Sequence, residues 1–386
     1  MSKSVKINVS RLKWSIQDAG LSNDELASKV HISLSKLKKV LQNENGLSPK
    51  QLSDIATFFN RGMLFFLNPK PINQKNIHST NFRTIASKKP DFDLSIKSII
   101  KKLEENREIF IGLLEEIDEF DETPWLPREL TDSVTNYEHL ATQIRKWLQL
   151  DDALDLQKLR RLIAAKRIHI VFSSPYKGQW HLPKDSTVRG LSLYYDQYPI
   201  IFVKKQDSDT AQTFTIVHEL AHLILHRDSS LDYAEDLLSQ SGHEKEANHL
   251  AGLILIPDHF ISQIDIGKLK SATFHEFDEL LDFHKNQWGV SVEVILRRLV
   301  NEKLINSSNY QSYREAKSKV VVPKKIDEKI PRMYRHREPL HLFGKTYVQT
   351  VFDALSSQKI TAVRAARFLD NIKVPDLRKL EKYVRN

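Results

Sequence analysis

Residues 215–226 read TIVHELAHLILH, which places three histidines and one glutamate in an otherwise apolar run. His218, Glu219 and His222 follow the spacing H-E-x-x-H. On an α-helix, residues four apart lie about 40° from one another around the axis, so both imidazoles could bind one zinc ion. Glu219 would lie beside them and could accept a proton from a water molecule that the ion acidifies. The spacing therefore predicts a zinc site of the kind that hydrolyses peptide bonds.

A metal-free interpretation stays open, because a buried ion pair or a histidine–glutamate hydrogen-bond network would also satisfy these side chains. The apolar residues around them make unpaired histidine or glutamate side chains costly to bury. The chain contains no cysteine, so histidine, aspartate or glutamate must hold any metal.

The motif by itself offers two ligands, whereas a catalytic zinc site uses three protein ligands and keeps one position open. A longer form of the motif would supply a third histidine, but Leu225 and Asp228 stand where its glycine and histidine would be. His226 lies two turns beyond the first motif histidine, too far to bind the same ion, so we expect a supporting or structural role for it. A second helical pattern, HEKEANHLAGLILIP, begins with Glu244 and Glu246. The third ligand is therefore expected from this second helix.

Several elements would position the site. Apolar, β-rich runs at residues 168–172, 191–196 and 199–205 predict three short strands before the motif helix. Helical periodicity over residues 137–148 and over the run LDLQKLRRLIAAK predicts two helices before the strands. Together these elements predict an α+β domain.

The N-terminal region has the pattern of several short helices. Ser22 with Glu25 has the capping-box spacing, and Ser48 followed by Pro49 marks another helix start. Residues 21–60 resemble the lambda-repressor-like (XRE) helix-turn-helix family, in which the second helix of the motif enters the DNA major groove. We expect the outward-facing residues of that helix and its ends to contact DNA: Ser33, Ser35, Lys36, Lys38, Lys39 and Gln42. A helical bundle that binds only a protein is the alternative.

Four blocks between residues 191 and 305 resemble the ImmA/IrrE family of metallopeptidases: SLYYDQYPIIFV, TFTIVHELAHLILH, EKEANHLAGLILIP and WGVSVEVILRRLVNEKLI. The resemblance implies a gluzincin-like zinc endopeptidase with His218 and His222 as Zn²⁺ ligands and Glu219 as the general base. It also implies that the third ligand is Glu246, the glutamate of the E-A-N block, with Glu244 as the other candidate.

The expected fold class is multi-domain and mainly α, with a small α+β gluzincin-like metallopeptidase domain and an N-terminal all-α helix-turn-helix domain. Further helices are expected at residues 94–120, 347–358 and 361–369. The expected domains are the following: 1–70, the helix-turn-helix domain; 71–135, a linker and an acidic connecting helix; 136–310, the ImmA/IrrE-like domain; and 311–386, a basic helical region of open role.

The formal net charge of +9 is unevenly distributed, because residues 1–70 carry +6, residues 301–386 carry +10 and the middle carries −7. Basic ends of this kind favour contact with a polyanion, although solvated lysine and arginine faces would give the same count. No signal peptide and no long apolar run is present, so we expect a cytoplasmic protein without a membrane segment.

These features predict a DNA-binding transcriptional regulator that carries a zinc-dependent endopeptidase of narrow specificity. Its expected partners are a double-stranded DNA operator and a protein substrate, either a repressor or the chain itself, and the acidic helix could support a homodimer. The alternative is a non-catalytic antitoxin-type repressor that uses the peptidase fold to bind a toxin.

Overall fold

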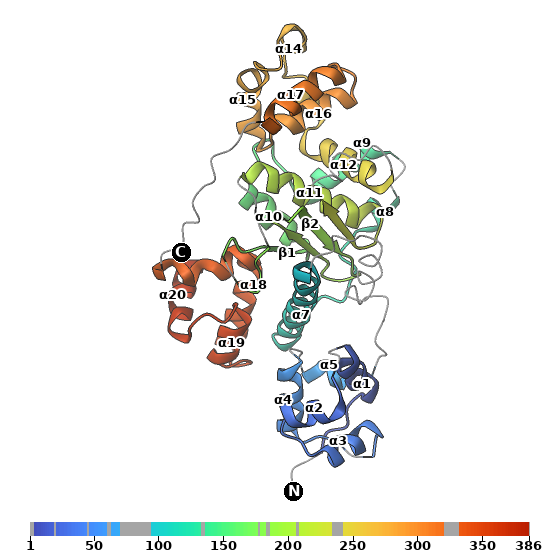
Figure 1. The fold of residues 1–386 in the computed structure, drawn as a ribbon, viewed down its shortest axis with the longest axis vertical. Helices are drawn as coiled ribbons and strands as arrows, with labels where there is room; N and C mark the ends of the chain where they lie inside the picture. The colour runs from blue at the N-terminus through green and yellow to red at the C-terminus, as the bar shows by residue number, and fades with distance from the viewer. Residues whose placement is uncertain are drawn as a thin grey trace. The chain divides into compact units, whose positions relative to one another are not determined.

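The computed structural model describes the following residues: 4–18, 21–44, 46–59, 63–69, 94–132, 136–176, 178–182, 186–205, 208–233, 242–319 and 332–385. The chain divides into two compact units. The first unit is Met1–Asp121 with Gln349–Leu377, and the second unit is Glu122–Val348 with Arg378–Asn386. Both are mainly helical (Figure 1), and none of the helices in the described part of the chain is long and apolar enough to cross a lipid bilayer.

Five short helices in the first unit surround an apolar core. They are α1 (Val9–Asp18), α2 (Asn23–Lys29), α3 (Leu34–Leu41), α4 (Pro49–Phe58) and α5 (Met63–Leu67). Their core includes the fully buried side chains of Leu12, Leu26, Leu37, Leu47, Ile55 and Phe66. Each helix is too short to be stable alone, so burial of these side chains supplies most of its stability.

The predicted helix starts in this unit are confirmed. The Ser22 N–H donates to Glu25 Oε2 at 2.8 Å, while the Glu25 N–H donates to Ser22 Oγ at 3.2 Å. Ser48 forms the same kind of capping box at the start of α4. Between α2 and α3 the chain turns sharply through His31, whose φ is +53°. Gly20, which we expected to end the first helix, lies outside the described residues.

The predicted acidic helix is α7 (Leu94–Glu116), which ends before residue 120 because the chain turns at Asp118 with a φ of +59°. It belongs to the first unit together with α19 (Ala362–Phe368). Burial raises the pKa of Glu116, and the positive charges of Arg364 and Lys359 oppose this rise. Since Arg364 and Lys359 act on Glu116, the end of α7 lies near α19 and the residues just before it, within the first unit.

The second unit contains a sheet and the remaining helices. The strands are β1 (His169–Phe172), β2 (Val188–Leu193), β3 (Ile200–Val203) and β4 (Ser230–Tyr233). The helices within this unit are α8 (Arg128–Asp132), α9 (Tyr137–Leu148), α10 (Leu156–Ala164), α11 (Asp209–Leu225), α12 (Gly242–Leu255), α13 (Asp258–Ile261), α14 (Ile266–Ser271), α15 (Phe277–Trp288), α16 (Val292–Asn301), α17 (Ser307–Lys319) and the 3-10 helix η3 (Arg332–Arg337). Two further helices, α18 (Glu338–Ser356) and α20 (Val374–Arg385), continue from one unit into the other.

The sheet has the strand order β1-β3-β2-β4. β1 runs parallel to β3, whereas β2 runs antiparallel to both β3 and β4, so the sheet is mixed. Leu191 at the centre of β2 lies opposite Phe202 of β3 and Leu231 of β4. All residues of β1 and β3 are buried, as expected for strands that elements cover on both faces.

The helix α11 carries the H-E-x-x-H motif and is the central helix of the second unit. Ser208 caps it by accepting a hydrogen bond from the Ala211 N–H at 3.2 Å, and every side chain from Gln212 to Ile224 is buried. It packs against β2 and β3 and against α12 (Figure 1). Because α11 is buried all round, its polar side chains must find their partners inside the unit.

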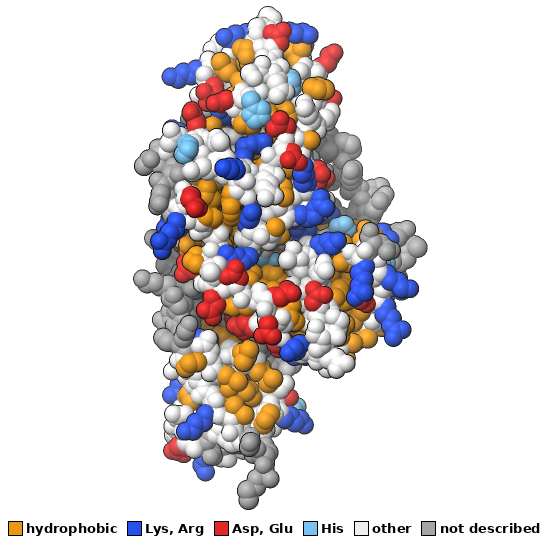
Figure 2. Space-filling view, turned by 180° about the vertical axis from the view of Figure 1, so that it is seen from behind, with side chains coloured by type: hydrophobic (Ala, Val, Ile, Leu, Met, Phe, Trp, Pro, Cys, Tyr) orange, Lys and Arg blue, Asp and Glu red, His pale blue; other side chains and the backbone are white. Residues whose placement is uncertain are grey.

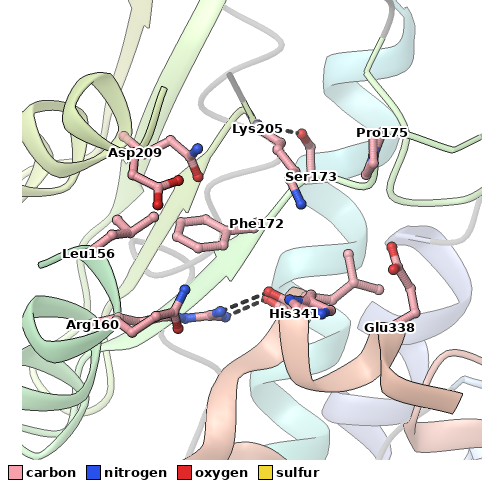
Figure 3. Close-up of a pocket in the computed structure, with 12 residues that line it drawn as sticks. Leu156, Arg160, Phe172, Ser173, Pro175, Lys205, Asp209, Glu338 and His341 are labelled. Carbon is pink, nitrogen blue, oxygen red and sulfur yellow. Dashed lines mark hydrogen bonds between the residues drawn. The ribbon is translucent and has the colours of Figure 1, made fainter. Parts of the chain in front are cut away.

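Arg160 of α10 attaches the start of α18 to the second unit. Its guanidinium donates to His341 O at 2.7 Å, to Leu342 O at 2.7 Å and to Ile170 O at 2.9 Å, and lies 4.3 Å from the centroid of the Phe172 ring. Figure 3 shows the two hydrogen bonds from Arg160 to α18. They lie beside a pocket that is lined by Arg160, Phe172, His341 and Leu342 together with Lys205, Asp209 and Glu338.

The bend in α18 next to this guanidinium depends on Gly344. Its φ of +80° and ψ of 172° are open only to glycine, and an added Cβ would lie 3.2 Å from Arg160 Nε. Burial lowers the pKa of Arg160 to about 9, so the side chain keeps its charge at neutral pH.

The sequence predicts most of these elements. The strands expected at 168–172 and 199–205 correspond to β1 and β3, and the expected helix at 137–148 matches α9. The strand expected at 191–196 overlaps β2 only at residues 191–193, because β2 begins at Val188. β4 and α20 were not predicted, and α18 begins nine residues before the predicted start at Tyr347. The predicted C-terminal region 311–386 is divided between the two units.

Candidate metal centre

Three potential ligand atoms meet where α11 packs against α12. His218 Nε2 and His222 Nε2 lie 3.1 Å apart on one face of α11. From α12, Glu244 Oε2 lies 3.4 Å from the first of these nitrogens and Glu244 Oε1 lies 3.5 Å from the second. Both histidine side chains are buried, whereas the Glu244 side chain is 24% exposed. The two helices therefore direct two nitrogens and one carboxylate to one place.

The donor set and its spacing fit a zinc ion. Zinc bound to nitrogen or oxygen at about 2.0–2.1 Å in tetrahedral geometry places its ligand atoms about 3.3–3.4 Å apart. The three separations given above, from 3.1 to 3.5 Å, bracket this value. Burial by itself raises the pKa of Glu244, but hydrogen bonds and charge from His218 and His222 outweigh it and lower the pKa to about 2. The carboxylate is thus an anion at neutral pH, which is the form that binds a cation.

Glu219 points toward the sheet beside this group. It is fully buried, and Ser230 Oγ of β4 donates to its Oε2 at 3.2 Å. Ser192 Oγ of β2 lies 2.9 Å from Ser230 Oγ and can donate to it, since the hydrogen of Ser230 is used for Glu219. The two hydroxyls orient a buried carboxylate that follows His218 directly in the chain. Nothing in the sequence around the two serines signalled this contact.

Gly190 of β2 makes room for the carboxylate of Glu219. A Cβ at this position would overlap Glu219 Oε1 and lie 2.7 Å from Thr215 Cγ2. If Glu219 is the general base that the sequence predicts, Gly190→Ala should displace it and lower the rate of the expected peptide cleavage by roughly 10- to 100-fold, because a displacement of about 1 Å is costly in catalysis. The bound metal should be retained, because the residue faces no metal ligand. Steady-state cleavage and zinc content measure both effects.

Gly252 of α12 supplies the matched control for this substitution. A Cβ at Gly252 would lie 3.8 Å from Arg298 Cδ, which is ordinary contact distance. Gly252→Ala should leave the cleavage rate unchanged. Equal rates for the two alanine variants would contradict the role of Gly190.

The structure brings Glu244, and not Glu246, to the two motif histidines. Within the described residues, Glu246 instead groups with His226 and His243. Residues two apart on a helix lie about 200° from one another, so only one of the two glutamates can face the motif. Glu246 Oε2 lies 3.0 Å from the Nε2 of His226, which ends α11. Ligation by either glutamate stays a prediction, and this placement favours Glu244.

The predicted DNA-contacting residues lie on and next to α3. Ser33, Ser35, Lys38, Lys39 and Gln42 are exposed there. The remaining predicted residue, Lys36, is half-buried and donates from Nζ to Gln51 Oε1 at 2.7 Å, so part of its binding capacity is used within the unit. On the face that Figure 2 draws, basic and acidic side chains are interspersed, so the net positive charge does not gather there. The DNA-binding prediction rests on the exposed side chains of α3.

A histidine pair and a glutamate from the next helix, beside a buried glutamate and a small mixed sheet, are the features of a metallopeptidase-type domain. Residues 168–300 match the family model described as Peptidase_M78, the IrrE N-terminal-like domain. This segment runs from the start of the sheet into α16 and includes all four site residues. No curated protein and no solved structure matches the chain.

Proposed function

We propose that this chain is a zinc-dependent endopeptidase of narrow specificity that cleaves a regulatory protein, and that its first unit binds an operator in double-stranded DNA. The observation that carries the proposal is the meeting of His218, His222 and Glu244 beside the buried Glu219. The family match to residues 168–300 supports the peptidase class. A repressor, or the chain itself, is the proposed substrate.

The residues around the site would have different roles in peptide hydrolysis. A zinc ion held by His218, His222 and Glu244 would supply Lewis acidity, which acidifies water and polarises a carbonyl group. Glu219 accepts the proton of the attacking water and later delivers it to the amide nitrogen as the C–N bond breaks. Ser230 holds the carboxylate in place by its hydrogen bond.

The position of β4 suggests how a substrate is held. β4 is the last strand in the order of the described sheet and carries Ser230 next to Glu219. An extended peptide could add to its outer edge by main-chain hydrogen bonds, which would place a scissile bond near the glutamate. Main-chain pairing gives affinity without sequence selectivity, so side-chain contacts must provide the narrow specificity.

The metal proposal predicts one zinc ion per chain in the purified protein. His218→Ala and Glu244→Ala should each abolish stoichiometric zinc, since a site with two remaining ligands binds weakly. Elemental analysis after dialysis against a weak chelator measures this. His275→Ala, which changes an exposed histidine of the same unit, is the control and should keep the zinc. Full zinc content in His218→Ala would contradict the site.

The DNA proposal predicts a loss of affinity when the exposed lysines of α3 are removed. The double substitution Lys38→Ala with Lys39→Ala should weaken DNA binding. It should also reduce the slope of log Kd against log salt concentration by about 2, since each lost phosphate contact removes about 0.9. Lys6→Ala with Lys13→Ala removes the same charge from exposed positions outside α3 and should have a smaller effect. Fluorescence anisotropy with the upstream DNA of the gene at several salt concentrations measures both. Equal slopes for the two pairs would count against α3 as the DNA-binding surface.

A further inference from the structure

The motif segment contains a third histidine, His226, which the proposed hydrolysis does not use. It ends α11 and lies about 12 Å along the helix axis from His218, too far to share an ion with it. Its two ring nitrogens contact different partners. Nδ1 lies 3.0 Å from His222 Nδ1, and Nε2 lies 3.0 Å from Glu246 Oε2. His226 therefore joins a carboxylate of α12 to one of the proposed metal ligands.

The direction of the hydrogen bonds in this row follows from the chemistry of its ends. The ionised carboxylate of Glu246 has no hydrogen to donate, so His226 Nε2 must carry the proton of that bond. A neutral His226 then presents Nδ1 as an acceptor, and His222 Nδ1 donates to it. The proton of His222 is thus held on Nδ1. Its Nε2, which faces His218 and Glu244, is then the nitrogen that would offer a lone pair to a bound metal, replacing the hydrogen bond to Glu244 in the metal-free site.

Glu246 also lies near a third element. Burial, together with the negative charge of Glu246, raises the pKa of Tyr137 at the start of α9, so the carboxylate lies near this tyrosine. The contact that fixes Glu246 is its hydrogen bond with His226 at 3.0 Å.

A second metal site is the competing interpretation, since His226, His243 and Glu246 offer three ligand atoms within 4.8 Å of one another. The rings of His226 and His243, however, are stacked with centroids 4.0 Å apart and planes 13° from parallel. The lone pair of an imidazole nitrogen lies in the plane of its ring. Two nearly parallel rings at this separation cannot both direct a lone pair at one ion.

We propose that Glu246 and His226 form a relay that fixes the tautomer and orientation of His222, and that both act as positioning residues for the metal centre. This inference rests on the proposed function, because it assigns a role toward the zinc ion of that site. Partners of metal-bound histidines that accept their second N–H raise metal affinity in this way. The relay also gives a use to Glu246, which the family resemblance implied as a ligand.

The zinc affinity of the full-length protein tests the relay, measured by competition with a chelator of known affinity. Glu246→Leu and His226→Leu should each weaken zinc binding by about 10- to 100-fold without abolishing it. His226→Gln retains an acceptor for His222 and should recover part of the affinity. His243→Ala is the matched control, because this histidine stacks on the relay but donates and accepts no bond in it, and it should bind zinc as tightly as the unchanged protein.

Nitrogen-15 NMR of the zinc-loaded protein provides a readout that a merely structural role would not change. We expect His222 with a protonated Nδ1 and a metal-bound Nε2, and His226 with a protonated Nε2. In Glu246→Leu, the His226 signals should shift toward the tautomer protonated on Nδ1. The zinc-free variants should still unfold cooperatively, with no more loss of stability than the removal of one or two hydrogen bonds causes.

The outcomes separate the relay from the proposed function. Unchanged zinc affinity and unchanged tautomers in Glu246→Leu and His226→Leu would overturn the relay while leaving the metal centre intact. A second equivalent of zinc that is lost in His243→Ala would also overturn it, in favour of a second metal site. An unchanged protein that binds no zinc at His218 and His222 would overturn both proposals.

Discussion

Glu219→Gln should leave zinc bound and lower the rate of peptide cleavage by about 10²- to 10⁴-fold, the usual contribution of a general base. Glutamine has nearly the same shape and can still accept the hydrogen bond from Ser230, but it cannot take up a proton from water. The fully buried position of Glu219 makes the effect specific, because no nearby bulk water can replace its carboxylate. The substitution thus removes proton transfer and little else.

Cleavage of a co-expressed candidate repressor, together with zinc content, measures this effect. Glu279→Gln is the control, because it makes the same change at an exposed position of the second unit and should cleave normally. Cleavage by Glu219→Gln at the unchanged rate would contradict its role as the base. The peptidase proposal fails if neither the unchanged protein nor Glu219→Gln cleaves any regulator. If these two proteins also neutralise a co-expressed toxin equally, the antitoxin-type function is favoured.

Arg160→Met should lower the free energy of unfolding of the second unit by about 2–5 kcal/mol. The guanidinium donates to carbonyl oxygens of Ile170, His341 and Leu342, which join β1 to the start of α18. Within the described residues its partners are carbonyl oxygens and no carboxylate forms an ion pair with it, so removal leaves buried acceptors unsatisfied. Each such acceptor costs about 1–3 kcal/mol, and loss of the buried charge offsets part of the sum.

Urea unfolding monitored by tryptophan fluorescence measures this loss. Arg161→Met changes the next residue of α10, which is exposed, and should alter the stability by no more than about 0.5 kcal/mol. Arg160→Lys should recover little, because one ammonium group cannot reproduce the planar fork that reaches three carbonyls. Equal stability of the two methionine variants would show that α18 is held by other contacts.

The sequence by itself determined the local features of this protein. The capping residues Ser22 and Ser48 act on backbone groups three residues away, so their spacing was enough to predict the helix starts. The facing of His218 and His222 follows from helix geometry in the same way. The strands β1 and β3 were predicted because buried strands are nearly continuous apolar runs, whereas β2, with Arg189, Gly190 and Ser192, was predicted only in its second half.

Only the tertiary structure decided which side chains from distant segments meet. Glu244 and Glu246 are equivalent in the sequence, and the rotation of α12 against α11 selects the first for the motif histidines and the second for His226. β4 has too few apolar residues to be recognised alone, and pairing with β2 makes it a strand and brings Ser230 to Glu219. The physical reason is that helix caps and helix faces depend on short-range geometry. A metal centre depends on how helices and strands from distant parts of the sequence pack together, and a local sequence pattern does not contain this information.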